Sequence, residues 1–284
     1  MDTEPISARQ RRAGRWSLLL AVPAALVSIG PLAWSITSSL RPTRDILANL
    51  YPLSWETVVP TSLTLENYAG VLSGNFVAAL GNSVVVALAS IVVGLLLSSS
   101  AAFALAVLPF RGRGVVFSLM VVSFLIPFEA IAIPLSSSFR DWGLSNTYLG
   151  LILPAVGNGL AIFLLRQFFL GVPASLGEAA RMDGVSWFGV YWRIYLPLSR
   201  AALVGAGLII FVFQWQSFLW PLLIAPAPQM KVASVAIADF AQELGVDYGQ
   251  MFAGAVLTAL VPLVLMLVFQ RQFTGSLASS GSKE

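Results

Sequence analysis

The side chains best suited to bind a small polar molecule lie in one short segment, Gln214-Trp215-Gln216-Ser217. Amide and hydroxyl groups both donate and accept hydrogen bonds, and an indole ring offers a flat apolar face. Such a set fits the hydroxyls and ring faces of a sugar. A structural role is the alternative, because Trp is frequent at membrane boundaries and polar side chains join helices there. The sequence leaves both interpretations open.

Glu129 is the second candidate, because it is the single charge in the stretch from Gly114 to Phe139. A bare carboxylate at hydrocarbon depth is costly, so Glu129 should face protein or water. It could line a path for a polar solute, or it could be a structural, hydrogen-bonded or solvated group. Pro127 and Pro134 flank it and predict a bent or broken helix, which would suit a gate.

The residue types present in the chain give little support for a catalytic role. The chain has no Cys and no His, which excludes thiolate sites, His-based triads and HExxH zinc sites. Its two lysines, Lys231 and Lys283, lie outside any G-x-x-x-x-G-K-[ST] loop. We therefore predict no catalytic residue, no metal site and no cofactor held by this chain itself.

The composition explains this lack of polar chemistry. Of 284 residues, 57% are hydrophobic and only 10% are charged, and the mean hydropathy is +0.84. A soluble domain carries about 25% charged residues and needs polar groups to cover its surface. The chain is therefore predicted to be an integral membrane protein, which also gives its basic balance a cause other than nucleic-acid binding.

Six stretches are long and apolar enough to cross about 30 Å of hydrocarbon as helices. Lipid permits only helices or closed barrels, and these runs are too long and continuous for barrel strands. The predicted fold is therefore an all-α integral membrane protein with six transmembrane helices, near residues 16–40, 78–108, 114–139, 142–165, 201–225 and 248–270.

The basic residues predict the orientation. Twelve Lys and Arg flank one side of the predicted helices and four, Arg41, Arg44, Arg140 and Lys231, flank the other. By the positive-inside rule both termini are cytoplasmic, with tails at 1–15 and 272–284. An extracytoplasmic loop then covers 41–77, and Thr64 to Tyr68 within it predicts the capped start of a short surface helix.

The cytoplasmic loop at 171–198 has a readable local structure. Ser175 and Glu178 match an S-x-x-E capping box, which predicts a helix from Leu176. Gly184 is a natural left-handed stop, and Ser186 can cap a second helix.

The second helix of this loop is predicted to be apolar on one side. Trp187, Val190, Tyr191 and Ile194 recur at helical spacing, and Pro197 ends the helix. Apolar surface outside the hydrocarbon must dock on something. The surface could be covered by the chain's own helices, by lipid headgroups or by another protein.

The same loop resembles the EAA loop of binding-protein-dependent ATP-binding-cassette importer permeases. That pattern is E-A-A, three residues, G, nine residues, I-x-L-P. The chain fills all seven fixed positions of this pattern: Glu178, Ala179, Ala180, Gly184, Ile194, Leu196 and Pro197. It also has Asp183 at a position where the family usually has an aspartate.

Further segments resemble the carbohydrate-uptake permeases with six helices, the maltose type. They include Thr64 to Tyr68 followed by Asn82-Ser83, Asn146 to Pro154, and Phe218 to Leu222. The stretch Trp215-Gln216-Ser217 departs from the family's frequent Trp-Asn-acidic triplet. The C-terminal end departs from its usual Gly-Ala-x-Lys-Gly.

The resemblance implies a non-catalytic permease in a prokaryotic inner membrane, forming half of a sugar pathway. It implies a second permease subunit, a dimer of ATPase subunits that hold ATP and Mg, and an extracytoplasmic solute-binding protein. The EAA helix would then couple to the ATPase, with Ala179 and Ala180 against it. Another solute, such as a glycerol phosphodiester or polyamine, or an ion-coupled transporter, is the alternative.

Overall fold

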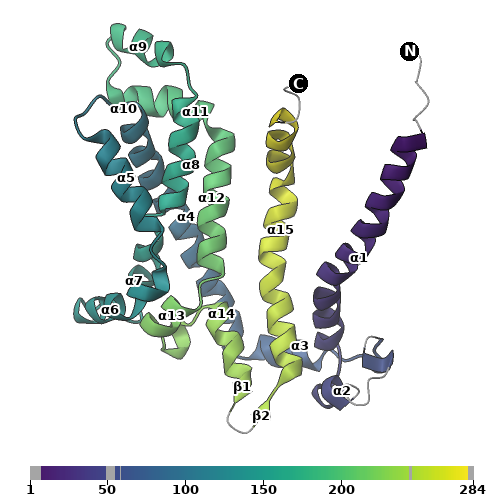
Figure 1. The fold of residues 1–284 in the computed structure, drawn as a ribbon. Coiled ribbons are helices and arrows are strands. Elements are labelled where there is room, and N and C mark those ends of the chain that lie inside the picture. Colours follow the sequence, from purple (N-terminus) through teal and green to yellow (C-terminus); the bar gives the residue numbers. More distant parts are fainter. Residues whose placement is uncertain (1–7, 49–54, 58, 243–244, 281–284) are drawn as a thin grey trace. The chain divides into compact units, whose positions relative to one another are not determined.

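The computed structural model describes residues 8–48, 55–57, 59–242 and 245–280, with side chains described between 21 and 270 (Figure 1). The first seven residues of the expected N-terminal tail, and the last four residues with Lys283, lie outside the described residues. The described chain is helical except for one small antiparallel pair of strands, as the sequence predicts. It divides into two compact units, residues 1–74 with 240–257 and residues 75–239 with 258–284.

The first unit contains the N-terminal helix, most of the expected extracytoplasmic loop at 41–77 and the start of the last helix. It contains α1 (Ala8–Ser39), α2 (Thr43–Ala48), η1 (Trp55–Thr57), α3 (Glu66–Ser73), β1 (Ala241–Gln242), β2 (Gly245–Val246) and the start of α15 (Tyr248–Ser280). The Asn67 side-chain amide donates to the carbonyls of Ser39 and Arg41 at 2.8 and 2.7 Å. Thr43 donates to Asp247 at 2.8 Å. These bonds join the end of α1, α2, α3 and the start of α15.

Three sequence expectations fall in this unit. The short helix expected after Thr64 is confirmed, because α3 begins at Glu66, but the expected side-chain cap is wrong, because the N-cap is Leu65 and no side chain caps the helix. Thr64 Oγ1 instead accepts from the Glu66 N–H at 3.1 Å, before the helix. The expected tails are partly helical, since α1 already begins at Ala8 and α15 continues to Ser280. The expected loop at 41–77 contains α2, η1 and α3 rather than irregular chain alone.

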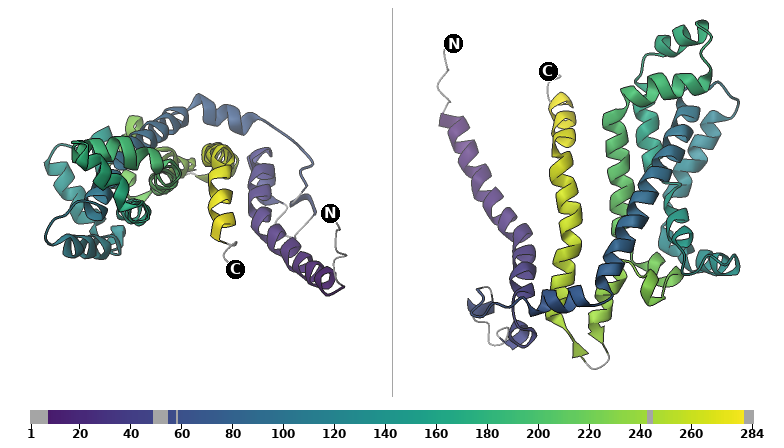
Figure 2. Two further views of the ribbon diagram at one scale, coloured as in Figure 1. Left: turned by 90° about the horizontal axis from the view of Figure 1, so that it is seen from above. Right: turned by 180° about the vertical axis from the view of Figure 1, so that it is seen from behind.

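The second unit is built around α4 (Phe76–Ala106), which packs on α8 and α12. Figure 2 shows these three helices side by side from behind. The other elements of the unit are α5 (Arg113–Phe124), α6 (Phe128–Asp141), α7 (Tyr148–Ile152), η2 (Leu153–Ala155), α8 (Gly159–Leu170), α9 (Ala174–Met182), α10 (Trp187–Val190), η3 (Tyr191–Tyr195), α11 (Leu196–Leu198), α12 (Arg200–Trp215), α13 (Leu219–Ile224), η4 (Pro228–Met230) and α14 (Ala233–Ala236). The helix η5 (Ile237–Phe240) follows α14.

Three helical segments are long and apolar enough to cross a membrane, 21–39, 76–106 and 248–270. Three bent pairs would raise the number to six: 113–124 with 128–141, 148–155 with 159–170, and 187–198 with 200–215. The first pair bends by 93° between Phe124 and Phe128, so the break expected near Pro127 is confirmed. Pro134 lies inside α6 and does not interrupt it.

One end of α4 carries a polar clamp that sequence reasoning did not assign. The Asn82 amide donates to the carbonyls of Gln229 and Lys231, both at 2.9 Å, and Asn82 Oδ1 accepts from the Tyr148 hydroxyl at 2.7 Å. The Ala233 N–H donates to Ser83 Oγ at 2.8 Å. The Asn82-Ser83 pair therefore holds the chain after α13 against α4 and α7, which gives this part of the resemblance a structural cause.

Candidate functional site

The first helix of the 171–198 loop, α9, begins earlier than the sequence suggests. It covers Ala174–Met182 with Pro173 at its N-cap, and no side chain caps it. The predicted capping box is wrong, because Ser175 lies inside the helix and its hydroxyl is not at the N-cap. The extended Pro173, with φ −55° and ψ 124°, enters the helix directly and its carbonyl accepts the Leu176 N–H at 3.2 Å.

The turn that ends α9 is confirmed at Gly184, whose φ is +81°. The Val185 N–H donates to the Ala180 carbonyl at 2.9 Å, and the Gly184 N–H donates to the Arg181 carbonyl at 3.1 Å. This pair of bonds is a Schellman motif, which requires the left-handed conformation that glycine adopts without steric cost. Gly184 therefore sets the direction in which the chain leaves α9.

Arg181 reinforces the same turn. Its Nη1 donates to the Val185 carbonyl at 2.7 Å, and its guanidinium carbon lies 5.0 Å from the ring centroid of Trp187. The side chain therefore joins the end of α9 to the start of the next helix. A cationic residue near a helix C-terminus is a recognisable signal, but its partner Trp187 is fixed only by the turn.

The second helix starts as predicted and then departs from regular α-helical spacing. Ser186 accepts the Gly189 N–H at 3.2 Å, so the predicted cap is confirmed. Residues 191–195 form a π-helical turn, in which the Leu196 N–H donates to the Tyr191 carbonyl. Pro197 lacks an N–H, and its ring crowds the carbonyl four residues earlier, which favours the wider turn. The helix ends at Leu198, close to the predicted stop.

The buried face of the second helix includes one residue more than predicted. Val190 and Tyr191 are buried, and Trp187 and Ile194 are half-buried, so the predicted apolar face is confirmed. Tyr195 was not predicted in this face but is also buried. Tyr195 lies four residues after Tyr191, so it is on the same side of the helix, and the π turn keeps it there.

This face docks on the chain's own helices. Tyr191 and Tyr195 pack on Phe103 of α4, with ring centroids 5.3 and 5.1 Å apart. Tyr195 also meets Phe169 of α8 edge-on at 5.6 Å, and the Tyr191 hydroxyl lies 2.7 Å from Ser99 Oγ. Of the open alternatives, the chain's own bundle covers the second helix.

The helix α9 is different, because most of it is exposed. Figure 1 shows it projecting beyond α10 and α11 at the end of the unit. Gly177 is buried against Val190 and Tyr195, and Ala180 is half-buried on the same cluster. Ala179 is exposed. We expected both alanines to face a partner, but Ala180 instead packs on its own chain because it lies one turn from Gly177 on the inner side.

The other residues of the EAA pattern also divide into exposed and partly buried positions. Glu178, Asp183, Gly184 and Pro197 are exposed, and Leu196 is half-buried against the cluster. Several large apolar side chains of the loop are exposed without having been predicted, most of all Met182 with 84% and Phe188 with 71% of their surface accessible. Met182 ends the projecting helix α9, and an apolar side chain exposed to this degree there is typical of a protein contact.

The proposed polar segment lies where α12 ends. Gln214 and Ser217 are half-buried and Gln216 is exposed, and the Ser217 carbonyl accepts from Ser234 Oγ at 2.6 Å. Trp215 is buried and stacks on Phe211 at 5.3 Å. Glu129 is exposed in the first turn of α6, beyond the 93° break, rather than inside a continuous helix.

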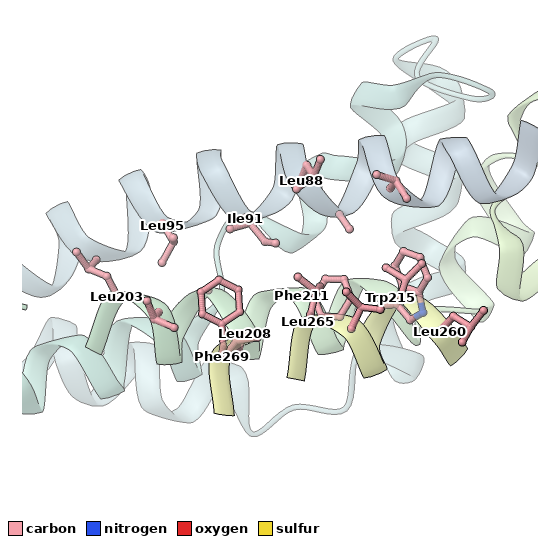
Figure 3. Close-up of a pocket in the computed structure, with 16 residues that line it drawn as sticks. Leu88, Ile91, Leu95, Leu203, Leu208, Phe211, Trp215, Leu260, Leu265 and Phe269 are labelled. Atoms are coloured by element: carbon pink, nitrogen blue, oxygen red, sulfur yellow. The ribbon is translucent and has the colours of Figure 1, made fainter. Parts of the chain in front are cut away.

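Trp215 faces an apolar cavity rather than a polar one. Figure 3 shows it at one end of a cavity of about 690 Å³ between α4, α12 and the part of α15 in the second unit. All of its lining residues are apolar: Val84, Ala87, Leu88, Ile91, Leu95, Leu203, Val204, Gly207, Leu208, Phe211, Trp215, Leu260, Val261, Val264, Leu265 and Phe269. The structure therefore separates Trp215 from an environment in which hydroxyl groups would be solvated.

Known proteins resemble the chain over most of its length. A family described as binding-protein-dependent transport system inner membrane component matches residues 90–275. The arabinooligosaccharide transport permease of Halalkalibacterium halodurans is 34% identical over 91% of this chain and 92% of its own length. The trehalose transport permease of Mycobacterium tuberculosis is 32% identical over 96% and 98%.

A solved structure supports the fold. A chain from the crystal structure of a bacterial ABC transporter that imports the acidic polysaccharide alginate matches with a TM-score of 0.82, covering 95% of this chain and 99% of that one. Because the two sequences are only 22% identical, this match shows a shared fold and nothing further. The family match covers well over half of the chain and includes the whole 171–198 loop. The chain is therefore an inner membrane component of a binding-protein-dependent transport system, an ABC importer permease.

Proposed function

We propose that the chain forms half of the translocation pathway of a sugar importer, with a second permease subunit and two ATPase subunits, and receives its sugar from an extracytoplasmic binding protein. The sugar class is supported by the relatives named for arabinooligosaccharides and trehalose. The orientation follows from the distribution of Lys and Arg, which places the 171–198 loop and both termini in the cytoplasm.

The observation that carries the proposal is that the 171–198 loop is packed on the chain's own helices on one side and exposed on the other. Its inner side is fixed on α4, α8 and α12 through Tyr191 and Tyr195, while α9 projects with Met182 exposed. A force applied to α9 therefore passes through a rigid turn to helices of the bundle. This is the arrangement required of an element that couples an ATPase to membrane helices.

The chain alone is expected to hydrolyse no ATP, because it lacks a P-loop. Purified alone, it should show no hydrolysis above a protein-free control. Co-produced with the ATPase, the second permease and the binding protein of its importer, it should support hydrolysis that rises with the loaded binding protein. Uptake of labelled oligosaccharides into vesicles then identifies the solute. A complex that assembles but takes up glycerol phosphodiesters or polyamines and no sugar would contradict the sugar assignment.

The solute path remains a proposal, for which Glu129 and the segment Gln214 to Ser217 are the candidates. Glu129→Gln is expected to lower uptake several-fold while leaving assembly normal, if the carboxylate contacts solute. Its exposed place in the first turn of α6 predicts a stability loss of only about 0.3–1 kcal/mol from the helix dipole. Asp141→Asn, at the exposed far end of the same helix, is the matched control. Unchanged uptake kinetics in an assembled Glu129→Gln complex would remove Glu129 from the path.

A further inference from the structure

Arg41 is the most unusual polar side chain among the described residues. It follows the end of α1 in the first unit, and only 2% of its surface is exposed. The nitrogens Nε, Nη1 and Nη2 of its guanidinium are buried, and none has a hydrogen-bond partner. Only its backbone is engaged, since its carbonyl accepts from Asn67 and its N–H donates to Ser38.

Nearby acidic residues of the same unit are engaged elsewhere. Asp45 accepts from Ser62 at 3.1 Å and lies 3.5 Å from Arg44. Asp247 accepts from Thr43 at 2.8 Å and from the Gln250 side chain at 2.9 Å. Asp45 and Asp247 therefore bind hydroxyl, amide and exposed cationic groups, and neither is hydrogen-bonded to the buried guanidinium.

A buried guanidinium without a counter-charge is strongly unfavourable, and arginine cannot lose its proton to escape the cost. Its planar fork of N–H donors fits the two oxygens of a carboxylate, which bind it in parallel. The missing group is therefore best described as a carboxylate that another molecule supplies.

We propose that Arg41 receives a carboxylate of the second permease subunit when the two subunits assemble. This rests on the proposed function, which supplies the second subunit. The helix that leads to Arg41 has a surface free for a neighbouring subunit, since only 6% of its apolar segment 21–39 is buried and Leu26, Val27 and Leu32 are largely exposed. A subunit that covers α1 would reach its end at Arg41. Because the guanidinium is enclosed, the segment around it shifts on assembly, and a permanent subunit suits this better than a transiently docking binding protein.

The test compares Arg41→Met in the isolated chain and in the complex. In the isolated chain the change removes an uncompensated charge and keeps apolar volume, so the melting temperature should rise by roughly 2–4 °C or more. In the complex the same change should lower the amount of second permease that co-purifies with the tagged chain at least tenfold. Arg41→Lys keeps the charge but loses the fork, so its melting temperature should stay near wild type while assembly falls.

The matched control is Arg44→Met, three residues away, where 84% of the side chain is exposed. It should change neither melting nor assembly. A lower melting temperature for Arg41→Met in the isolated chain would overturn the proposal, because Arg41 would then have a partner within its own chain. Normal assembly of Arg41→Met would also overturn it. This holds even if the assembled variant has lost stimulation by the binding protein. Failure of the wild-type chain to retain any second permease would instead contradict the proposed function, and the melting comparison would still be informative.

Discussion

Met182→Asp is expected to lower sugar uptake at least tenfold without affecting the fold of the chain. Met182 has 84% of its surface exposed at the end of α9, so its own chain loses little when it changes. Burying a Met side chain in a partner contributes about 1.5–3 kcal/mol, which corresponds to roughly 10- to 150-fold in affinity. An aspartate there would also bring an unpaired charge into the contact. Retention of the ATPase on the tagged permease and uptake into vesicles are the measurements.

Two further variants make this result specific. Met182→Leu keeps the volume and apolar character, so it should retain most of the uptake. Phe110→Asp changes another exposed apolar residue, in the segment between α4 and α5, and should leave ATPase retention near wild type. If Met182→Asp and wild type retained equal amounts of ATPase and equal uptake, α9 would not be the coupling helix in the form proposed here.

Gly184→Pro is expected to abolish coupled transport, because it removes both features on which the turn depends. Proline cannot adopt the φ of +81° found at Gly184, and it lacks the N–H that donates to the Arg181 carbonyl. Forcing the turn into another conformation costs about 1–3 kcal/mol and changes the direction of α9. Hydrolysis by the assembled complex should then lose its dependence on the loaded binding protein.

Gly184→Asn is the informative comparison, since asparagine tolerates the left-handed region and keeps its N–H. Apart from the adjoining residues, no atom lies within 4 Å of a Cβ placed at Gly184, so there is open space where the added side chain begins. Asparagine should therefore retain most of the coupling. Equal loss in both variants would point to a direct contact at this position, and wild-type behaviour of Gly184→Pro would show that the turn is dispensable.

Sequence reasoning worked best where one residue type has one local use. Gly184 at a positive φ, Ser186 as a cap and the break at Pro127 follow from properties of single residues, and all three are confirmed. The capping box was wrong because Ser175 and Glu178 fit the pattern while Pro173 starts the helix earlier. Tyr195 was missed because the predicted series ended at Ile194, although the position four residues after Tyr191 also lies on that face.

Contacts between distant residues could not be predicted from spacing. The bond from Tyr148 to Asn82 joins residues 66 apart in sequence, and the bonds from Asn82 to the chain after α13 join residues about 150 apart. The burial of Arg41 likewise depends on how segments of the first unit meet. A basic residue in a polar loop is ordinarily solvent-exposed, and nothing in the sequence marks Arg41 as an exception.

The breaks inside the bent helix pairs affect how well a bilayer accommodates the chain. At 12 residues each, α5 and α8 are about 18 Å long, well short of the roughly 30 Å of hydrocarbon. Gly159 at the start of α8 leaves room for the Phe124 ring at the end of α5, so the two interruptions lie side by side. Backbone groups released at such breaks must be hydrogen-bonded by protein or water, because lipid offers them no partner. The broken pairs therefore suit hydrocarbon only where protein or water covers their breaks, so neighbouring protein at this depth would raise the free energy of unfolding of this chain in a bilayer.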